Sequence, residues 1–402
     1  MIMTVKIEKS IANGVVEAPP SKSVAHRALI CGSLSGGSEI RNLAYSKDIQ
    51  ATIDCLEKMG ACVKEDGNSV RVGGLNVEKA KENVEVFCNE SGSTLRFLIP
   101  LAMFLGKKIT FCGSQRLFER PLGVYEDICK KQGVLFEKKH DRVTVFGKLK
   151  SGEYSIPGDI SSQFITGLLF VLPLLESDSI LTVTGKFESA SYIDLTLNTM
   201  RSFGVEISRR DNVFFIKGGQ SYTSQNYTVE GDCSNAAFLE AFNLLGGNVE
   251  VKGINPDTLQ GDRVYKSYFG FLKNNGKTFD LSDCPDLAPV MFAMAAYKGG
   301  AEFTGTARLK IKESDRAEAM AEELAKFGIE VSVFDDSVTV HKGRVKTPAE
   351  LLQGHNDHRI VMALSLLCSV TGGTIEGAES VSKSYPDYFE KIESMGIMVK
   401  IQ

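Results

Sequence analysis

The sequence lacks the patterns that identify the commonest metal and nucleotide sites. Its nine cysteines form no Cys-x-x-Cys pair and no zinc-type spacing with histidine. No Walker loop, Gly-x-Gly-x-x-Gly unit or His-Glu-x-x-His motif is present, which leaves nucleotide and zinc sites without support. Several cysteines, such as Cys31 and Cys368, lie in apolar surroundings, and this predicts reduced structural thiols in a cytoplasmic protein.

Long apolar runs and an excess of basic charge are missing as well. The longest apolar run, near residues 164–175, is interrupted by Thr166, Gly167 and Pro173, so no membrane-spanning segment is expected. The first residues are too few and too polar for a signal peptide. A formal net charge of −4 and a pI near 5.9 argue against a nucleic-acid partner. Small anionic ligands remain compatible, because they need only local positive charge.

What the chain does contain is one pattern repeated six times. A polar or acidic start signal precedes a mostly apolar helix, at steps of about 70 residues with one short step of about 52. The starts lie near Ser21, Ser91, Ser161, Ser234, Asp286 and Asp357. A second, amphipathic helix follows and ends at a glycine, and then strands such as residues 331–334 and 338–341 begin.

Each copy therefore predicts the order strand, helix, strand, helix, strand, strand. The six copies divide into two groups of three, with a break near residues 219–227, where Gly, Ser, Gln, Asn and Tyr gather. A length of 402 residues and a hydrophobic content of 43% fit two or perhaps three domains with large cores.

The helix starts predict a site for anions. A helix start carries free N–H groups and roughly half a positive charge, and here Lys and Arg lie beside several starts. The ligands should carry more than one phosphate or carboxylate. Two such anions about 4 Å apart repel by several kcal/mol at an effective dielectric near 20, which four or five Lys and Arg would offset.

Two motifs combine cations with hydroxyls or acids. The first motif surrounds Lys22. Ser23 and Arg27 are four residues apart and share one face of the helix, so hydroxyl, ammonium and guanidinium groups can converge on one anion. In the motif of residues 312–316, Glu313 stands between Lys312 and Arg316 and is a candidate acid or base. Either motif alone is also compatible with an ordinary solvated, capped helix start.

Other helix starts offer further candidates. In residues 356–359, Arg359 is a better ligand candidate than His358, since a single histidine is more often structural. Arg120 precedes a proline, which holds its backbone extended and can aim the side chain at a ligand. Asp286 is an acid at a helix start, although a charge in this position is common without function.

Eight motifs occur in the order in which one enzyme family carries them. They are Pro-Ser-Lys-Ser-x-x-x-Arg, Ser-Gly-Ser-Thr-x-Arg, Glu-Arg-Pro, Ser-Ser-Gln-Phe, Pro-Asp-x-Ala, Lys-Glu-Ser-Asp-Arg, Asp-His-Arg and Lys-Ser-Tyr-Pro-Asp-Tyr, between Lys22 and Tyr388. Each motif alone is weak, but the ordered set is highly specific. The chain therefore resembles the EPSP synthases (3-phosphoshikimate 1-carboxyvinyltransferases), a family of enolpyruvyl transferases.

The resemblance implies a two-domain inside-out α/β barrel of six βαβαββ repeats, three per domain, with buried helices. Domain 1 would comprise residues 1–18 and 231–402, domain 2 residues 19–230, and the active site would lie in the interdomain cleft. The implied reaction transfers the enolpyruvyl group of phosphoenolpyruvate to the 5-hydroxyl of shikimate 3-phosphate and releases phosphate. No metal or organic cofactor, no nucleic acid and no membrane is expected, and the family is usually monomeric.

The resemblance also assigns residues by position. Shikimate 3-phosphate would contact Lys22, Ser23, Arg27, Ser161, Ser162, Gln163, Ser189, Tyr192, Asp286 and Lys312. Phosphoenolpyruvate would contact Lys22, Gly92, Arg120, Gln163, Arg316, Arg359 and Lys383. The catalytic residues would be Asp286, as the base for the 5-hydroxyl, with Glu313 and Lys22 handling protons at the methylene and phosphate ends; which of these two does which stays open.

Two alternatives remain at this stage. The sister transferase that acts on UDP-N-acetylglucosamine shares the fold, but it carries a reactive cysteine five residues before its loop arginine. That place is Gln115 here, and Cys112 is out of position. A non-catalytic protein that binds phosphorylated metabolites would need the cations but neither Asp286 nor Glu313.

Overall fold

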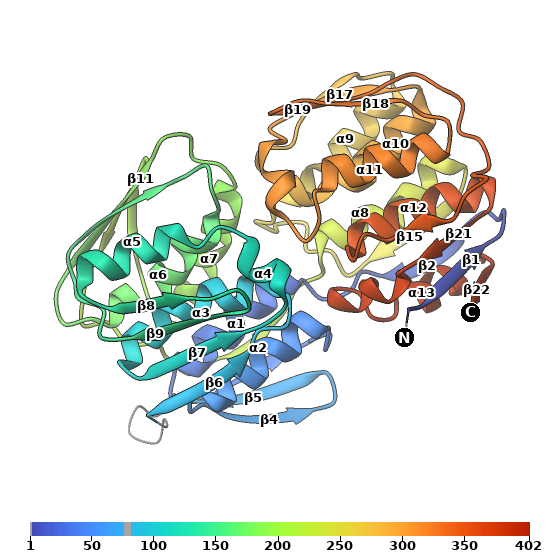
Figure 1. Ribbon diagram of the computed structural model, residues 1–402. Coiled ribbons are helices and arrows are strands. Elements are labelled where there is room, and N and C mark those ends of the chain that lie inside the picture. Colours follow the sequence, from blue (N-terminus) through green and yellow to red (C-terminus); the bar gives the residue numbers. More distant parts are fainter. Residues whose placement is uncertain (1, 76–81) are drawn as a thin grey trace. The chain divides into compact units, whose positions relative to one another are not determined.

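The computed structural model describes residues 2–75 and 82–402. They form two compact units (Figure 1): Pro20–Val229, and the N-terminal segment through Pro19 together with Glu230–Gln402. Each unit has its own hydrophobic core. Within the described residues, no helix has the length and apolar character that crossing a membrane requires.

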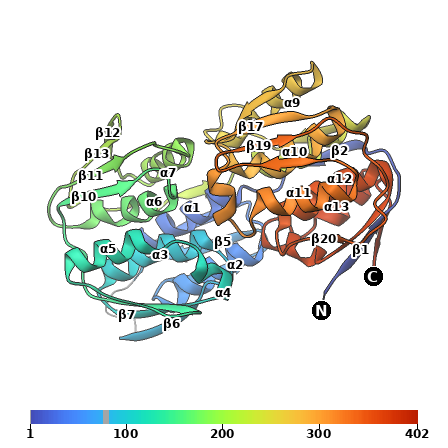
Figure 2. The ribbon, with the colours of Figure 1, turned by 45° about the horizontal axis from the view of Figure 1, so that its top comes forward.

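The unit Pro20–Val229 carries its most buried helices at its centre, with sheets outside them (Figures 1 and 2). The central helices are α1 (Lys22–Leu34), α3 (Gly92–Leu105) and α6 (Ser162–Val171), and the others are α2 (Lys47–Lys58), α4 (Gln115–Glu119), α5 (Gly123–Gln132) and α7 (Ala190–Ser202). Because α3 and α6 are buried on nearly every side, their apolar sequences need no polar face.

Three four-stranded sheets of this unit share one topology, in which the first pair of strands is parallel and the other two pairs are antiparallel. In order, they are β14 (Asn226–Thr228), β3 (Ser38–Arg41), β5 (Ser69–Gly73), β4 (Cys62–Asp66); β6 (Asn83–Phe87), β7 (Lys108–Cys112), β9 (Arg142–Phe146), β8 (Leu135–Lys138); and β10 (Glu153–Pro157), β11 (Ser179–Thr184), β13 (Val213–Ile216), β12 (Ser208–Arg210). Two copies follow the predicted order of helices and strands along the chain, whereas the copy that begins with α1 takes its first strand, β14, from the end of the unit.

The other unit has the same arrangement of central helices and outer sheets, and the two ends of the chain contribute strands to it. Its central helices are α8 (Cys233–Glu240), α10 (Ala288–Lys298) and α12 (His358–Thr371), and its outer helices are α9 (Tyr265–Lys273), α11 (Arg316–Lys326) and α13 (Tyr388–Ser394). Its sheets are β20 (Leu352–Gln353), β21 (Gly373–Glu376), β1 (Thr4–Ile7), β22 (Val399–Ile401); β16 (Thr278–Asp280), β17 (Ala301–Thr304), β19 (Ser337–Val340), β18 (Val331–Val333); and β15 (Asn248–Lys252), β2 (Asn13–Glu17). The N-terminal strand β1 pairs with both β21 and β22, so the first and last segments of the chain complete one sheet.

One copy of the repeat is abbreviated, which explains the short step of about 52 residues. Its sheet has only β15 and β2, whereas the five other sheets have four strands. After α9 ends at Lys273, the chain enters β16 at Thr278, with no hairpin between them among the described residues. The left-handed residue after α9 is Asn275, at φ 64°, and not a glycine.

The helix starts lie where the sequence placed them, with two corrections. Ser21, Ser91, Ser161 and Asp357 are N-caps whose side chains accept backbone N–H groups. The cap of α8 is Asp232 and not Ser234, because the Asp232 carboxylate accepts the N–H of Asn235. Asp286 lies in a 3-10 turn before α10, which has no side-chain cap, so its carboxylate is left for other partners.

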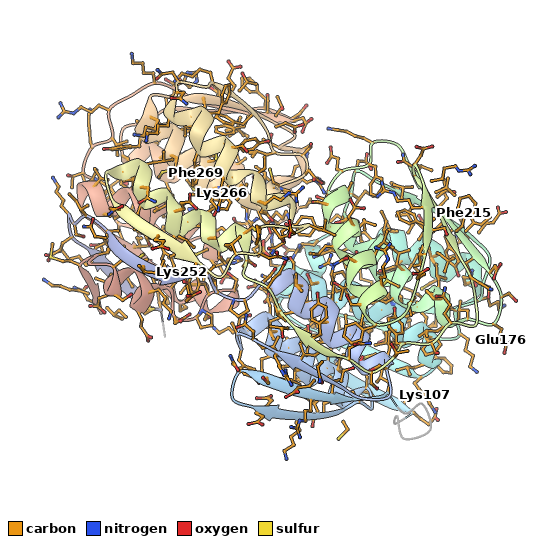
Figure 3. All side chains as sticks on the ribbon, turned by 180° about the vertical axis from the view of Figure 1, so that it is seen from behind. Lys107, Glu176, Phe215, Lys252, Lys266 and Phe269 are labelled. Atoms are coloured by element: carbon orange, nitrogen blue, oxygen red, sulfur yellow. The ribbon has the colours of Figure 1, made fainter. Side chains whose placement is uncertain are left out.

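The side chain of Asn243 closes the edge of β15 on which a hairpin would pair. Its Nδ2 donates to the Val249 carbonyl oxygen at 2.8 Å, and its Oδ1 accepts the Val249 N–H at 2.7 Å. Figure 3 shows Lys252 at the end of β15 and Lys266 and Phe269 on α9, the elements that flank the abbreviated repeat. One amide thus satisfies the backbone groups that a neighbouring strand would satisfy.

We expect Asn243→Ala to lower the free energy of unfolding by about 1–2 kcal/mol, because Val249 loses two hydrogen bonds. Amide hydrogen exchange at Val249 should accelerate in the same variant. Asn248→Ala is the matched control, since Asn248 lies on the same strand with an exposed side chain. Equal effects of the two variants would contradict the assigned role of Asn243.

Candidate active site

In the unit Pro20–Val229, the first residue of α1 supplies an ammonium group. Lys22 Nζ lies 2.9 Å from Asp48 Oδ2, at the start of α2, and the two side chains are 15% and 8% exposed. A partly buried ion pair of this kind fixes the position of the ammonium.

Arg27, one turn further along α1, is held by neutral oxygens. It is buried, and its guanidinium donates to Thr196 Oγ1 at 2.8 Å, to the Ser23 carbonyl oxygen at 2.6 Å and to the Tyr192 carbonyl oxygen at 3.0 Å. Burial lowers the pKa of Arg27 to about 10. Among the described residues, no carboxylate forms an ion pair with Arg27, and such a desolvated cation favours an anionic ligand.

Gly92 and Arg120 form a second cationic point. Arg120 has the extended backbone expected before a proline, at ψ 148°, and its side chain is buried. A Cβ on Gly92 would lie only 2.7 and 2.9 Å from the two terminal nitrogens of Arg120. Glycine therefore lets a guanidinium approach the N-terminus of α3, where two positive ends meet and an anion would be stabilised.

Gln163 is the centre of a polar chain at the start of α6. Its Nε2 donates to Ser93 Oγ at 2.9 Å, and its Oε1 accepts from Arg96 Nη1 at 2.7 Å. Arg96 also donates to the Pro121 carbonyl oxygen, directly after Arg120, at 3.1 Å. The predicted residues Ser161 and Ser162 stand at the same helix start, the first as its cap.

Ser189 is held in an unusual backbone conformation. It precedes α7 at φ 54° and ψ 41°, it is buried, and its hydroxyl makes no capping hydrogen bond. A non-glycine residue in this left-handed region costs free energy, which indicates that surrounding structure fixes its side chain. Tyr192 lies one turn later on α7 and contacts Arg27, as described above.

In the other unit, one carboxylate gathers three cations. Asp286 Oδ1 lies 3.3 Å from Lys312 Nζ and 2.8 Å from Arg316 Nη1, and Oδ2 lies 3.0 Å from Arg359 Nη2. Burial alone would raise the pKa of Asp286, but Arg359, Lys312 and Arg316 together hold it well below its usual value. Asp286 is therefore a carboxylate at neutral pH.

Arg316 joins this carboxylate to two more. The side chain is 1% exposed, and it lies 2.9 Å from Asp357 Oδ2 through Nε and 2.9 Å from Glu313 Oε2 through Nη2. Burial opposes the charge of Arg316, but Asp357, Glu313 and Asp286 raise its pKa well above the usual value. Three cations and three carboxylates thus balance in this cluster, namely Lys312, Arg316, Arg359, Asp286, Glu313 and Asp357.

Lys383 and Arg359 complete the cationic side of this unit. Lys383 is buried and donates to the carbonyl oxygen of Asn356 at 2.5 Å and to its side-chain oxygen at 2.7 Å. Arg359 also donates to Ser234 Oγ at 3.0 Å. His358 is buried beside Asp357, with 3.8 Å between Nδ1 and the nearest carboxylate oxygen.

The structure thus places the predicted residues in two groups, one in each unit. The group of Pro20–Val229 contains Lys22, Ser23, Arg27, Gly92, Arg120, Ser161, Ser162, Gln163, Ser189 and Tyr192, and the other contains Asp286, Lys312, Glu313, Arg316, Arg359 and Lys383. Sequence reasoning missed Asp48, Arg96 and the charge partners of Asp357. Asp357 was visible only as a helix start, and a carboxylate in a first helical turn gives no sign of its ion-pair partner.

The comparison with known proteins decides the family. The family model described as EPSP synthase (3-phosphoshikimate 1-carboxyvinyltransferase) matches residues 7–270 and 263–392. The chain belongs to the EPSP synthase family. A protein of Clostridium kluyveri named 3-phosphoshikimate 1-carboxyvinyltransferase is 43% identical, over 98% of this chain and 97% of that protein. A protein of Clostridium acetobutylicum with the same name is 40% identical over the same shares.

The fold agrees with this family. A solved EPSP synthase from Acinetobacter baumannii superposes with a TM-score of 0.79, and the superposition covers 100% of both chains at 22% sequence identity. The mixed α/β fold predicted from the sequence is therefore confirmed.

Arg316→Met should destabilise the unit that contains it by about 3–5 kcal/mol at pH 7, because Asp357 becomes a buried carboxylate without its guanidinium. In the wild type, burial by itself would raise the pKa of Asp357, but Arg316 together with His358 holds this pKa below its usual value. The contribution is therefore present above the unfolded pKa near 4 and is lost as pH falls through the lower folded-state pKa. In the variant the pKa of Asp357 rises, and protonation then relieves the penalty as pH falls.

The deficit in melting temperature should accordingly be largest at pH 7–8 and should shrink toward pH 4.5. Thermal unfolding across this range measures it, with Arg344→Met, at an exposed position, as the control. A deficit that does not change with pH would contradict the charge pairing.

Proposed function

We propose that the chain transfers the enolpyruvyl group of phosphoenolpyruvate to the 5-hydroxyl of shikimate 3-phosphate. The products are 5-enolpyruvylshikimate 3-phosphate and phosphate, a step of the shikimate pathway toward chorismate and the aromatic amino acids. The observation that carries the proposal is the 43% identity, over nearly the whole chain, with a protein named 3-phosphoshikimate 1-carboxyvinyltransferase. The two groups of cations described above support it, because both substrates are anions.

Residues of both units would contact the substrates. Shikimate 3-phosphate would bind Lys22, Ser23, Arg27, Ser161, Ser162, Gln163, Ser189, Tyr192, Asp286 and Lys312, and phosphoenolpyruvate would bind Lys22, Gly92, Arg120, Gln163, Arg316, Arg359 and Lys383. The absence of a paired carboxylate at Arg27 among the described residues supports its role with a phosphate. The balanced cluster around Arg316 supports a role in which an arriving anion competes with carboxylates for the same cations.

Asp286 would take the proton from the 5-hydroxyl as the oxygen attacks C2 of phosphoenolpyruvate. With three cations around it, Asp286 is too weak a base for this task. Substrate anions would draw Arg316 and Arg359 away from the carboxylate, and its pKa would rise toward a useful value. Substrate binding would thereby activate the base.

Two proton transfers remain at the methylene carbon. In the addition step, the former methylene gains a proton and a tetrahedral intermediate forms; in the elimination step, the methyl group loses a proton as the C2–O bond to phosphate breaks. Glu313 and Lys22 would handle the protons at the methylene and phosphate ends of phosphoenolpyruvate, and which of the two serves which end stays open. The ion pairs Glu313–Arg316 and Lys22–Asp48 fix both groups in place.

The two alternatives are less well supported. The family model and the relatives carry the name of the shikimate enzyme, and the position of the reactive cysteine in the nucleotide-sugar transferase is Gln115 here. A non-catalytic binding protein leaves Asp286 and Glu313 without a use. A monomeric state and a cytoplasmic location stay predictions.

Phosphate release tests the reaction directly. The wild type should release phosphate only when shikimate 3-phosphate and phosphoenolpyruvate are both present, and Asp286→Ala should lower kcat by about 100-fold or more, as expected for a lost general base. Asp283→Asn, at an exposed neighbouring carboxylate, is the control and should keep wild-type turnover. Release that requires UDP-N-acetylglucosamine, or no release at all, would refute the proposal.

Gly92→Ala should raise the KM for phosphoenolpyruvate by about tenfold, because its Cβ displaces the Arg120 guanidinium. The KM for shikimate 3-phosphate should change little. Gly123→Ala is the matched control, since a Cβ there meets no atom within 4 Å. If both KM values rise together, Gly92 does not act through the binding of phosphoenolpyruvate.

A further inference from the structure

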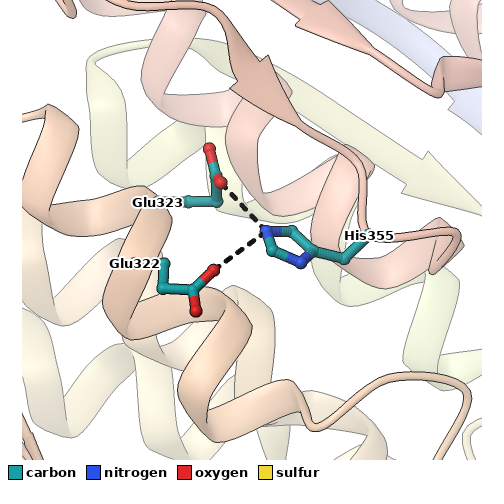
Figure 4. Close-up of side chains that lie close together, drawn as sticks. All are labelled: Glu322, Glu323 and His355. Atoms are coloured by element: carbon teal, nitrogen blue, oxygen red, sulfur yellow. Dashed lines mark hydrogen bonds and ion pairs between the residues drawn. The ribbon is translucent and has the colours of Figure 1, made fainter.

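Glu323, on α11, is a buried carboxylate outside the proposed site. Its side chain is 1% exposed, yet it makes four hydrogen-bond contacts to three groups. Oε1 lies 2.9 Å from His355 Nε2 and 2.8 Å from Lys326 Nζ, while Oε2 accepts from Lys326 Nζ at 3.0 Å and from the Gln353 N–H at 2.9 Å. Figure 4 shows Glu323 and the neighbouring Glu322 both facing the same nitrogen of the His355 ring.

The segment held by Glu323 has a costly backbone conformation. His355 and Asn356 are consecutive non-glycine residues with φ of 47° and 50°. Each residue in this region costs on the order of 1–3 kcal/mol unless its surroundings enforce it. The contacts of Glu323 with the Gln353 N–H and the His355 ring are well placed to enforce it.

The same segment carries groups that bind the proposed phosphoenolpyruvate cations. The main-chain and side-chain oxygens of Asn356 both accept from Lys383 Nζ. The next residue, Asp357, accepts from Arg316 Nε and from the Arg359 N–H, each at 2.9 Å. A shift of residues 355–356 would therefore move the oxygens that hold Lys383, and it would disturb the adjoining helix cap at Asp357.

Two side chains of helix α11 contact residues 353–357. Arg316 and Glu323 are seven residues apart, which places them two turns apart on one face of the helix. Arg316 holds Asp357, and Glu323 holds the residues just before it. The start of α12 is thus clamped to α11 on both sides of the strained turn.

A metal ion is the other use that these side chains suggest. Ligand atoms of Glu322, Glu323 and His355 lie within 4.8 Å of one another. However, the Lys326 ammonium contacts both oxygens of Glu323 and also the Leu351 carbonyl oxygen at 3.1 Å. The chain itself supplies the positive charge at this carboxylate, which disfavours a second cation there.

We propose that Glu323 is a positioning residue for phosphoenolpyruvate binding, because it holds the left-handed turn of residues 355–356 that orients Lys383. This inference rests on the proposed assignment of Lys383 to phosphoenolpyruvate. Glu323 itself touches no substrate and acts through the turn.

Steady-state kinetics of Glu323→Gln test the inference. The KM for phosphoenolpyruvate should rise by about tenfold while the KM for shikimate 3-phosphate changes less than about twofold. The control is Glu322→Gln, because Glu322 is 66% exposed and lies 3.8 Å from the same ring; it should leave both KM values unchanged. If Glu323→Gln does not fold, His355→Gly carries the test, since glycine accepts the left-handed backbone and removes only the imidazole.

A double-mutant cycle separates positioning from general stability. If Glu323 acts through Lys383, then Glu323→Gln should add little to the rise in KM caused by Lys383→Met. Additive effects, or a lower melting temperature with an unchanged KM for phosphoenolpyruvate, would overturn the inference. So would a wild-type activity that EDTA abolishes and Zn²⁺ restores.

The single variant Lys383→Met separates the assignment of Lys383 to phosphoenolpyruvate from the role of Glu323. An unchanged KM for phosphoenolpyruvate in that variant would refute the site assignment on which the inference rests. A raised KM in Lys383→Met beside an unchanged KM in Glu323→Gln would refute the role of Glu323 alone.

Discussion

The charge balance around Arg316 is the constraint on which the rest of its unit depends, the unit that contains Glu230–Gln402. A guanidinium that is 1% exposed stabilises the fold only if its partners offset its desolvation, and here three carboxylates do so. Two of these carboxylates, Asp286 and Glu313, are the proposed acid–base residues. The unit therefore stores its catalytic groups as ion pairs, and any ligand that takes the cations also changes the pKa of the carboxylates. Binding and proton transfer are coupled through the same few atoms.

The unit Pro20–Val229 holds its buried cations with different partners. Its Arg27 is bound by a hydroxyl and two carbonyl oxygens, so the cation is oriented but not neutralised. Arg120 is brought against the N-terminus of α3, so that a guanidinium and the positive end of a helix lie together. This unit is therefore organised to bind anions, whereas the other is organised to bind them and exchange protons. The difference follows from the partners of the cations and not from the cations themselves.

Much of this organisation could be predicted from the sequence, since capping residues and apolar runs act locally. The helix starts, the glycines that end outer helices and the extended backbone at Arg120 all follow from neighbouring residues. Contacts between distant segments could not be predicted in this way. The pairing of Arg316 with Asp357 spans 41 residues, and the left-handed turn at His355 depends on a carboxylate 32 residues earlier. The resemblance to a family predicted the roles of individual residues, but it did not predict the ion pair of Arg316 with Asp357 or the contact of Glu323 with His355.

The repeat itself explains how one backbone plan yields two kinds of half-site. At the central-helix starts, Pro20–Val229 has the caps Ser21, Ser91 and Ser161, whereas the other unit has the caps Asp232 and Asp357, and Asp286 in the 3-10 turn before α10. A serine caps the helix without charge and leaves its positive end available to a ligand. An aspartate adds a negative charge at that end, and at Asp286 and Asp357 this charge pairs with arginine. The carboxylates at these starts thus supply the ion-pair partners of the cations in this unit, which the serines of Pro20–Val229 do not provide.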